Sequence, residues 1–397
     1  MDADILVIGA GALGLSTALH CALAGRSVIV AERDTAGSQA SGRAAGLFKS
    51  VQADPLRTQI ARRSIERAVT FADWAGAPLD VVRSGSFLVA RTAAHQEFLR
   101  TEERQSRGWG AAVSVAGPGE LAGRVPYYRG SGAELALWCP EDVYVDEPID
   151  LIRAFARACA LHGAQVSEGE AVTAITLSGG RVAGAQTSRR SISAPVVVDA
   201  AGAWTGQVAA LAGAGVPVAP VRHQLLITEP AAEVGSLDPI VRVVDAAVYL
   251  RPARGGLMLG GFEPGPLAMD PPASTDDVPL DLGVLERMAS QVQPEVPAAK
   301  APVAEHRGGL FTMSPDGRFV AGPVPDVPGL WVASGCNGSG FSSSLGLGEA
   351  LAGQITGAAR SLDLAALAPG RFGQVTREAL VRDGVWQYEH YYDPAAG

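Results

Sequence analysis

The sequence of 397 residues lacks several features that mark particular classes of protein. Its four cysteines show no C-x-x-C spacing, so neither a disulfide framework nor a zinc site is indicated. No uncharged apolar run of about eighteen residues occurs, and we therefore expect no membrane span. Internal repeats are absent, and a strand-like run already begins at Ile5, which leaves no room for a signal peptide. We expect a cytoplasmic protein in which Cys21 and Cys159 are buried apolar groups on helices.

An excess of positive charge is also missing. The formal net charge at pH 7 is -9, and the pI is near 5.3. This balance argues against nucleic acid or an anionic membrane as the main partner, although a local basic pocket remains compatible with an acidic substrate. Charged residues make up 18% and hydrophobic residues 47% of the chain, a composition typical of globular proteins with a large core. At this length we expect two intertwined domains.

The most informative segment begins at Ile5–Ile8, an apolar run of strand type. Gly9, Gly11 and Gly14 follow it with the spacing G-x-G-x-x-G. In a strand–turn–helix unit, the first glycine permits a tight turn and the second lets the backbone approach a pyrophosphate. The third lets helix and strand pack closely. Because the chain has 48 glycines, the flanking elements decide the meaning of this pattern.

Those flanking elements complete a βαβ unit. A helix is expected over Leu13–Ala24, and a second strand over Ser27–Ala31 ends at Glu32. The helix N-terminus would present free N–H groups and its positive dipole end to phosphates, and Glu32 would accept hydrogen bonds from both ribose hydroxyls. We therefore predict that the chain binds an adenine dinucleotide. The alternative is a doubly wound domain with an empty site.

Two later segments go beyond a plain nicotinamide-binding domain. A buried strand expected over Ala194–Ala201 runs into Gly202, where a backbone turn can approach a ligand. A further strand, glycine loop and helix follow, with the strand over Gly329–Ser334 and the helix over Ser344–Gly357. A helix beginning there would direct its N-terminal dipole at an electron-rich group, for which a reduced isoalloxazine is the obvious candidate.

Residue periodicity predicts the remaining elements. Helices are expected over Ile60–Ala75, His95–Arg107, Asp150–His162 and Leu282–Val292. Strands are expected over Ser86–Ala90, Gln165–Glu168, Val172–Leu177, Arg181–Thr187, Arg222–Thr228, Ala246–Arg251 and Gly256–Phe262. We expect Gly265–Pro279 to be a loop. The tail from Ala365 is expected to pack on the surface with its aromatic residues Trp386, Tyr388, Tyr391 and Tyr392.

Five segments in order resemble flavoproteins of the D-amino-acid oxidase superfamily, in the branch of sarcosine and dimethylglycine oxidases and dehydrogenases. They are Gly9–Glu32, Gly37–Gly46, Val196–Trp204, Gly309–Gly317 and Gly335–Ser344. The string YLRPARGGLMLGGFEP, Tyr249–Pro264, is particularly similar to that branch. The resemblance implies an α/β fold (α+β overall), with a Rossmann-like FAD-binding domain and a substrate domain built on a large antiparallel sheet. Both domains would be discontinuous in sequence.

We expect the FAD-binding domain to comprise residues 1–85, 148–215 and 300–375. The substrate domain would comprise residues 86–147 and 216–299, and residues 376–397 would form a C-terminal tail. The resemblance also implies which residues bind the cofactor. The expected contacts are Gly9, Ala10, Gly11 and Gly14 at the pyrophosphate; Glu32 and Arg33 at the adenosine; Ser41, Arg43, Ala45 and Gly46 between pyrophosphate and flavin; Val172 at the adenine; Gly202 and Trp204 near the cofactor; and Gly338, Gly340, Phe341 and Ser342 at the isoalloxazine.

Departures from the family pattern are equally informative. Gly309 stands where monomeric sarcosine oxidases attach FAD to a cysteine, and the segment Ala44–Phe48 lacks the histidine that attaches FAD in dimethylglycine enzymes. We therefore expect non-covalent FAD. Phe311 replaces an arginine, and Ser342 a lysine, that bind the substrate carboxylate in relatives. Candidate replacements are Arg251 and Lys49, and the alternative is that both are surface residues.

Two residues are predicted to touch the substrate. The resemblance gives His223 the role of proton acceptor or substrate orienter, because a neutral imidazole can take a proton from an ammonium. Tyr249 would orient the amine or carboxylate. The alternatives are a structural histidine on a strand and an aromatic residue in a sheet core.

These expectations together predict an FAD-dependent amine oxidoreductase. A hydride would pass from the carbon next to the nitrogen of a secondary or tertiary amine to flavin N5, giving an imine that water hydrolyses. No metal is expected, and oxygen or another acceptor would reoxidise the flavin. The sequence leaves three alternatives open, namely a glycine or D-amino-acid oxidase, a flavin-holding subunit of a larger complex, and an NAD-dependent dehydrogenase.

Overall fold

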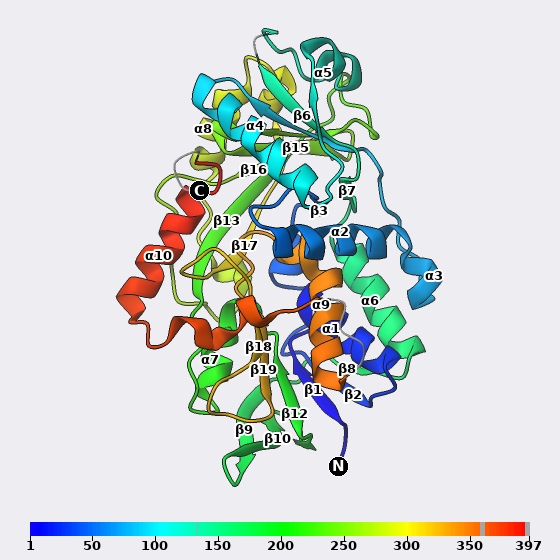
Figure 1. The fold of residues 1–397 in the computed structure, drawn as a ribbon, viewed down its shortest axis with the longest axis vertical. Helices are drawn as coiled ribbons and strands as arrows, with labels where there is room; N and C mark the ends of the chain where they lie inside the picture. The colour runs from blue at the N-terminus through cyan, green and yellow to red at the C-terminus, as the bar shows by residue number, and fades with distance from the viewer. Residues whose placement is uncertain (133, 358–361, 394–397) are drawn as a thin grey trace.

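The computed structural model describes residues 1–132, 134–357 and 362–393. Two large sheets lie at opposite ends of an elongated molecule, with helices between and around them (Figure 1). The mixed α/β architecture with a large, mostly antiparallel second sheet confirms the predicted fold class. No helix in the described residues is long and apolar enough to cross a membrane.

The first sheet contains the N-terminal βαβ unit. Its strands, in spatial order, are β18 (Val320–Pro323), β19 (Leu330–Ser334), β12 (Val196–Asp199), β1 (Ile5–Ile8), β2 (Val28–Ala31) and β8 (Gln165–Ser167). All neighbours pair in parallel except β18 and β19. Such sheets bind ligands outside the carboxyl ends of their strands, and the loop after β1 lies at that edge.

Alternate residues of β1 and β2 face two different layers. Ile5 and Val7 pack with α1 (Ala12–Leu23), α6 (Ile149–Leu161) and α9 (Gly340–Thr356). Leu6 and Ile8 face the small sheet of β9 (Val172–Ser178), β10 (Arg181–Thr187) and β11 (Ser191–Ser193). Both layers are apolar, so these strands read as continuous hydrophobic runs, as expected for a parallel sheet covered on both faces.

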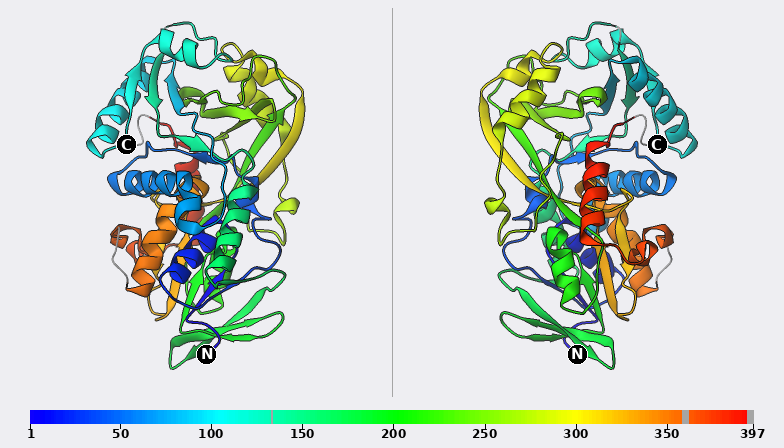
Figure 2. Two further views of the ribbon diagram at one scale, coloured as in Figure 1. Left: turned by 90° about the vertical axis from the view of Figure 1, so that its right-hand side faces the viewer. Right: turned by 90° about the vertical axis from the view of Figure 1, so that its left-hand side faces the viewer.

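The second sheet has eight strands. In spatial order they are β17 (Val303–Met313), β13 (Ala219–Thr228), β16 (Gly256–Gly261), β15 (Val248–Ala253), β14 (Ile240–Val243), β4 (Ser86–Ala90), β6 (Leu135–Cys139) and β5 (Ser114–Ala116). Helices α8 (Leu282–Val292) and α5 (Pro118–Arg124) pack on one face of this sheet, and α4 (Ala93–Gly108) packs on the other face at β4 and β6. The two side views show α4 and α8 on either side of the sheet (Figure 2). Because side chains alternate along each strand, the part of the second face that α4 leaves uncovered can line a site.

The remaining elements connect the two sheets. A short ribbon of β3 (Leu47–Phe48) and β7 (Val143–Tyr144) lies between them. The helix expected over Ile60–Ala75 is two helices, α2 (Pro55–Val69) and α3 (Phe71–Ala75), separated at Thr70. Short helix α7 (Thr205–Ala210) follows β12, and α10 (Arg377–Glu389) lies along β13 and β17 (Figure 1).

Strand β17 bears on the expected domain boundary at residue 300. It pairs with β13 from Val303 to Met313 and so belongs to the eight-stranded sheet, whereas we expected it among the FAD-binding segments. This long antiparallel pairing favours a boundary after Met313. The other domain boundaries remain proposals.

Candidate active site

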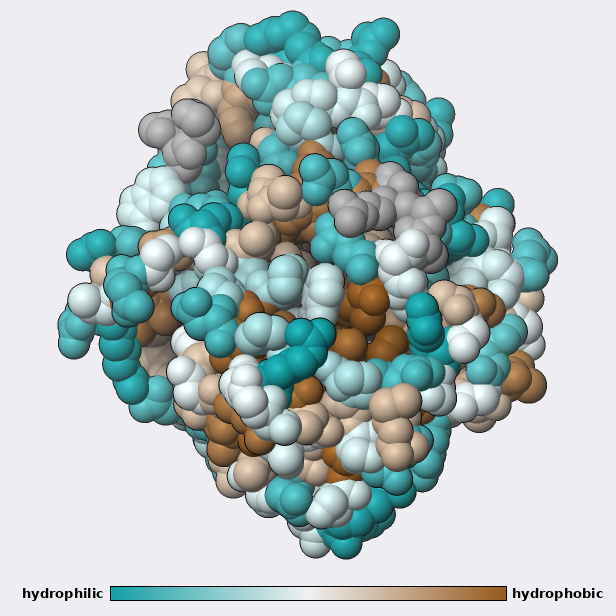
Figure 3. Space-filling view, turned by 60° about the horizontal axis from the view of Figure 1, so that its bottom comes forward, coloured by the Kyte–Doolittle hydropathy of each residue, from teal (hydrophilic) through white to brown (hydrophobic). Residues whose placement is uncertain are grey.

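A cavity of about 460 Å³ joins the two sheets, within the size range of roughly 300–1,000 Å³ that is usual for ligand sites. It runs from the loop after β1 to the inner face of the eight-stranded sheet. Every predicted site residue except Ala10 and Gly14 lines it. Hydrophobic surface shows in recesses near the middle of one face of the molecule, while the outline of that face is mostly hydrophilic (Figure 3).

The glycine loop leaves room for a phosphate group. Gly9 has φ of +102°, and a Cβ there would lie 2.6 Å from the Ala200 carbonyl oxygen. A Cβ on Gly14 would lie 2.0 Å from the carbonyl oxygen of Gly9, so this position closes the helix onto the loop. A Cβ on Gly11 would meet only the Ser41 hydroxyl, at 3.1 Å, because the residue faces the cavity. These spaces fit the division of roles expected for the three glycines.

Glu32 and Arg33 form the end of the cavity predicted for adenosine. The Glu32 carboxylate accepts hydrogen bonds from the backbone N–H of Ala10 at 2.7 Å and of Asp34 at 2.9 Å. Two of its lone pairs remain for ribose hydroxyls, and burial raises its pKa. The Arg33 guanidinium lies 4.5 Å from the ring centre of Trp204 and gives this end a flat wall.

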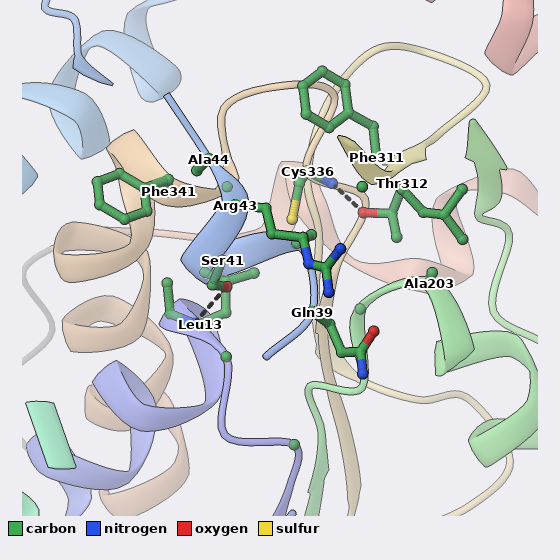
Figure 4. A pocket seen from close by; sticks show the side chains of 18 of the residues that line it. Leu13, Gln39, Ser41, Arg43, Ala44, Ala203, Phe311, Thr312, Cys336 and Phe341 are labelled. Carbon is green, nitrogen blue, oxygen red and sulfur yellow. Dashed lines mark hydrogen bonds between the residues drawn. The ribbon is translucent and has the colours of Figure 1, made fainter. Parts of the chain in front are cut away.

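A loop between β2 and β3 lines the middle of the cavity (Figure 4). The Ser41 hydroxyl accepts a hydrogen bond from the Ala12 N–H at 3.0 Å and so holds the first turn of α1. Arg43 donates from Nε to the Ser38 carbonyl oxygen at 3.1 Å and forms an ion pair with the exposed Asp276. The Arg43 charge is thus directed toward the loop around Asp276.

The start of α9 faces the other end of the cavity. The helix begins at Gly340, four residues before the expected start at Ser344, so Phe341 and Ser342 lie in its first turn. A Cβ on Gly340 would lie 2.6 Å from Cys336 Sγ, which explains the glycine. The Ser342 hydroxyl donates to the Ser339 carbonyl oxygen at 3.0 Å and therefore stays on the helix. Free N–H groups and the dipole at this helix end suit a ring that carries negative charge.

His223 lies on the cavity face of β13 and is held by two tyrosines. Its Nδ1 is 2.8 Å from the Tyr388 hydroxyl, and its Nε2 is 2.9 Å from the Tyr249 hydroxyl. The Phe311 ring stacks on the imidazole with a centroid separation of 4.1 Å. Burial lowers the pKa of His223 to about 3. The ring is therefore neutral, so one nitrogen donates to a tyrosine hydroxyl and the other accepts from one.

The C-terminal tail does not pack only on the surface, and this expectation was wrong. Tyr388 is fully buried, and Tyr391 and Tyr392 line the cavity. The tail forms α10, which approaches β13 and β17 closely because Gly384 has no side chain. A Cβ there would lie 3.1 Å from the Met313 Cβ. The signal that the sequence reasoning missed was the cluster of aromatic residues near the end of one helix.

The alternative that Arg251 and Lys49 are surface residues was also wrong. Arg251 is 0% exposed, and its guanidinium donates to the carbonyl oxygens of Ala45, Asp146 and Pro252 and to the Asp146 carboxylate. With its donors engaged, Arg251 is structural. Lys49 lines the cavity.

Arg242 is a cavity residue that the sequence reasoning did not find. It lies directly across from Tyr249 in the pairing of β14 and β15, so both side chains point to the same face of the sheet. No local motif marks this position. Its place in the cavity follows only from the strand register.

Comparison with known proteins identifies the family. A family model described as FAD dependent oxidoreductase matches residues 4–354. The chain belongs to this family. FAD is therefore its cofactor, and the resemblance read from the sequence is confirmed.

Similar proteins carry names of amine-oxidising enzymes. The chain is 28% identical to sarcosine dehydrogenase of Homo sapiens over 88% of its own length and 39% of that protein. It is 27% identical to 4-methylaminobutanoate oxidase of Paenarthrobacter nicotinovorans over 92% of its length and 45% of that protein. The chain thus spans less than half the length of these relatives. The solved structure of L-proline dehydrogenase from P. horikoshii matches 94% of this chain and 98% of its own, with a TM-score of 0.85 and 24% identity, and supports the fold.

Proposed function

We propose that this chain oxidises a C–N bond of a secondary or tertiary amine that carries a carboxylate, such as an N-methyl amino acid. The observation that carries the proposal is the buried His223–Tyr249 pair on the cavity wall, close to the glycine loop before α9. Relatives named for sarcosine and 4-methylaminobutanoate support the substrate class.

Bound FAD would supply the hydride acceptor for the carbon next to the nitrogen. The chain's residues position the substrate. Tyr249 presents its hydroxyl beside the cavity, and neutral His223 fixes the direction of that hydroxyl. Both His223 nitrogens are already engaged by tyrosines, which favours the role of orienter over that of proton acceptor. The aromatic walls formed by Phe262 and Phe311 exclude water and favour the uncharged amine that must react.

We also propose that FAD is held without a covalent bond. Gly309 offers no side chain for attachment, and Cys336 is the one cysteine among the described residues that line the cavity. Burial raises the pKa of the Cys336 thiol to about 11, which makes it a poor nucleophile. Acid precipitation should release all yellow colour into the supernatant. Colour retained in the pellet would contradict the proposal.

Two alternatives remain for the test to decide. A glycine or D-amino-acid oxidase is disfavoured because Phe311 stacks on the His223 ring and, unlike the arginine it replaces, offers no guanidinium to a substrate carboxylate. A flavin-holding subunit would bind FAD and leave catalysis to a partner. We would mix the purified yellow protein anaerobically with sarcosine, dimethylglycine, 4-methylaminobutanoate, glycine and D-alanine and follow flavin bleaching. Bleaching by an N-methyl compound supports the proposal, and no bleaching by any amine favours the subunit.

The electron acceptor and the location are further proposals. Either oxygen or another oxidant accepts the electrons, and mixing the reduced protein with air-saturated buffer separates the two. A cytoplasmic location is supported by the four free cysteines, of which Cys21, Cys139 and Cys159 are buried thiols. Fractionation of cells that make the native protein tests it.

A further inference from the structure

Besides Arg33 and Arg43, which belong to the predicted FAD contacts, two cationic side chains line the same cavity as the His223–Tyr249 pair. They are Lys49, just after β3, and Arg242, on β14. Among the described residues, neither side chain forms a hydrogen bond or an ion pair with the glycine loops expected to bind FAD. The cavity already has a loop that is expected to bind the phosphates of the cofactor. Further cations in the same cavity therefore suit a second anionic ligand.

The Lys49 ammonium forms no ion pair with the described residues. It lies 4.3 Å from the ring centre of Tyr391 and makes no hydrogen bond or ion pair with any residue in the described part of the chain. Burial, together with the charges of Arg242 and Arg57, lowers its pKa well below the ordinary value for lysine. A half-buried ammonium without an ion pair is stabilised most by a bound anion.

Arg242 also keeps an unused donor. It is 3% exposed, and its Nη2 donates to the Asp142 carboxylate and, at 3.0 Å, to the Ser86 hydroxyl. Its buried Nε has no partner among the described residues. Such an unmade bond is costly inside a protein. Because Nε is closed off from the cavity surface, the donor that a ligand in the cavity could reach is Nη1, which donates to none of the described residues.

The acids near this pair leave an excess of positive charge. The charged groups around Lys49 are Arg242, Arg57, Asp142 and Glu102. Asp142 offsets only one cation, and its carboxylate is already shared with Ser50 and Ser86. Arg57 lies 3.9 Å from its own partner Asp54, and burial raises the pKa of Glu102 to about 7. When Lys49 is protonated, the pair therefore suits a monoanion.

Tyr391 lies between Lys49 and the aromatic residues beside His223. Its ring stacks on Phe262 with a centroid separation of 4.0 Å, so the Lys49 ammonium occupies the opposite face of the ring. Phe262 in turn lies 5.6 Å from the His223 ring. Arg242 lies directly across from Tyr249 in the pairing of β14 and β15, and its charge acts on Lys49. The cations therefore border the chamber in which the amine would react.

We propose that Lys49 and Arg242 form the anion site that holds the carboxylate of the substrate. The inference rests on the proposed oxidation of a carboxylate-bearing amine and names the residues that replace the missing arginine at Phe311. Lys49 binds as an ammonium, and Arg242 donates from Nη1. The net positive charge of the site balances one carboxylate, and the C-terminal segment forms one of its walls.

The test uses a carboxylate that contains no amine and therefore cannot be oxidised at a C–N bond. We would titrate the FAD-loaded protein with butanoate and, separately, with the uncharged isostere butanamide in a calorimeter. Butanoate should bind and butanamide should bind at least tenfold more weakly, since a charge-assisted hydrogen bond is worth about 1.5–3 kcal/mol. Lys49→Met should weaken butanoate binding by roughly 10–100-fold, and Lys49→Arg should restore most of it.

The chain provides a matched control because it contains only one other lysine, Lys300. Lys300 is exposed and does not line the cavity, so Lys300→Met should bind butanoate as the wild type does. Equal binding of butanoate by Lys49→Met and Lys300→Met would overturn the inference, as would equal binding of butanoate and butanamide by the wild type.

The result is separable from the fate of the proposed function. Butanoate binding that depends on Lys49 supports the anion site even if no amine bleaches the flavin. If an amine bleaches the flavin but butanoate binding does not depend on Lys49, the proposed function stands and the anion site is rejected. Arg242 is not substituted in the test, because its loss would leave Asp142 buried without its cation and is expected to unfold the chain.

Discussion

The two ends of the cavity are built in different ways. The end that we propose for the cofactor, the cofactor end, is made of backbone, namely the glycine loop after β1, the loop that contains Ser41 and the start of α9. The end that we propose for the substrate, the substrate end, is made of single side chains from β13, β15 and the segment after α10, such as His223, Tyr249 and Tyr391. A backbone site tolerates few changes at its glycines, whereas a side-chain site can change its ligand one residue at a time. The predictions below probe this contrast.

The largest effect is expected at the cofactor end, from Gly14→Ala. The new Cβ would lie 2.0 Å from the Gly9 carbonyl oxygen, so the helix must shift away from the loop. We expect flavin to be lost and the free energy of unfolding to fall by about 3 kcal/mol. Absorbance gives the flavin content, and urea denaturation gives the stability.

Gly123→Ala is the matched control for that change. Gly123 also lies in a helix, α5, but a Cβ there meets nothing within 4 Å. This variant should keep its flavin and be as stable as the wild type or more so. If both variants retain flavin equally, the loop after β1 does not set the cofactor site.

The next effect is expected at the substrate end, from Tyr249→Phe compared with Tyr388→Phe. Each change removes one hydroxyl partner of His223, and each should cost about 1 kcal/mol of stability. Only Tyr249 lines the cavity. Stopped-flow measurement should therefore show flavin reduction slowed about 10–100-fold in Tyr249→Phe and much less in Tyr388→Phe. Equal slowing in both would mean that the hydroxyls act only by holding the imidazole.

The same contrast explains what the sequence predicts well. The strand Ile5–Ile8, the helix that follows and the glycine spacing form one local pattern, and the structure matches it to within one residue at each helix end. Such a site depends on backbone shape, which neighbouring residues encode. Sequence reasoning also singled out His223 and Tyr249, which line the cavity, but through resemblance to a family and not through a local rule.

The substrate end shows what sequence reasoning misses. Arg242 reaches the cavity because β14 pairs in register with β15, and Tyr391 because α10 packs across β13 and β17. Both placements depend on contacts between distant segments. Arg251 and Lys49 illustrate the same limit. The Arg251 guanidinium donates to backbone carbonyl oxygens, whereas Lys49 lines the cavity.

A moderate effect is expected on substrate choice. Phe311 stacks on His223 and offers no bidentate donor for an α-carboxylate beside the reacting carbon. Glycine and D-alanine should therefore reduce the flavin at least about tenfold more slowly than the best N-methyl substrate. The measurement is the limiting rate of anaerobic bleaching. Rapid bleaching by D-alanine would instead make the substrate end that of a D-amino-acid oxidase.

The smallest effect near neutral pH is expected from the titration of His223. Its pKa is about 3 in the folded protein and about 6.5 in the unfolded chain. Below pH 6.5 the unfolded chain therefore binds a proton that the folded protein does not, so the free energy of unfolding falls as the pH drops toward 3. The loss should be about 1.4 kcal/mol per pH unit in that window and absent above it.

His223→Gln isolates this contribution, because glutamine can keep hydrogen bonds to both tyrosines and does not titrate. Urea denaturation should show the wild type losing about 2 kcal/mol of its advantage over the variant between pH 7.5 and pH 5. The advantage should stay constant between pH 7.5 and pH 8.5. A constant advantage down to pH 5 would mean that the imidazole protonates freely in the folded protein. His223 would then be open to accept a proton from the substrate, and the substrate end would contain an acid–base group in place of a fixed orienting pair.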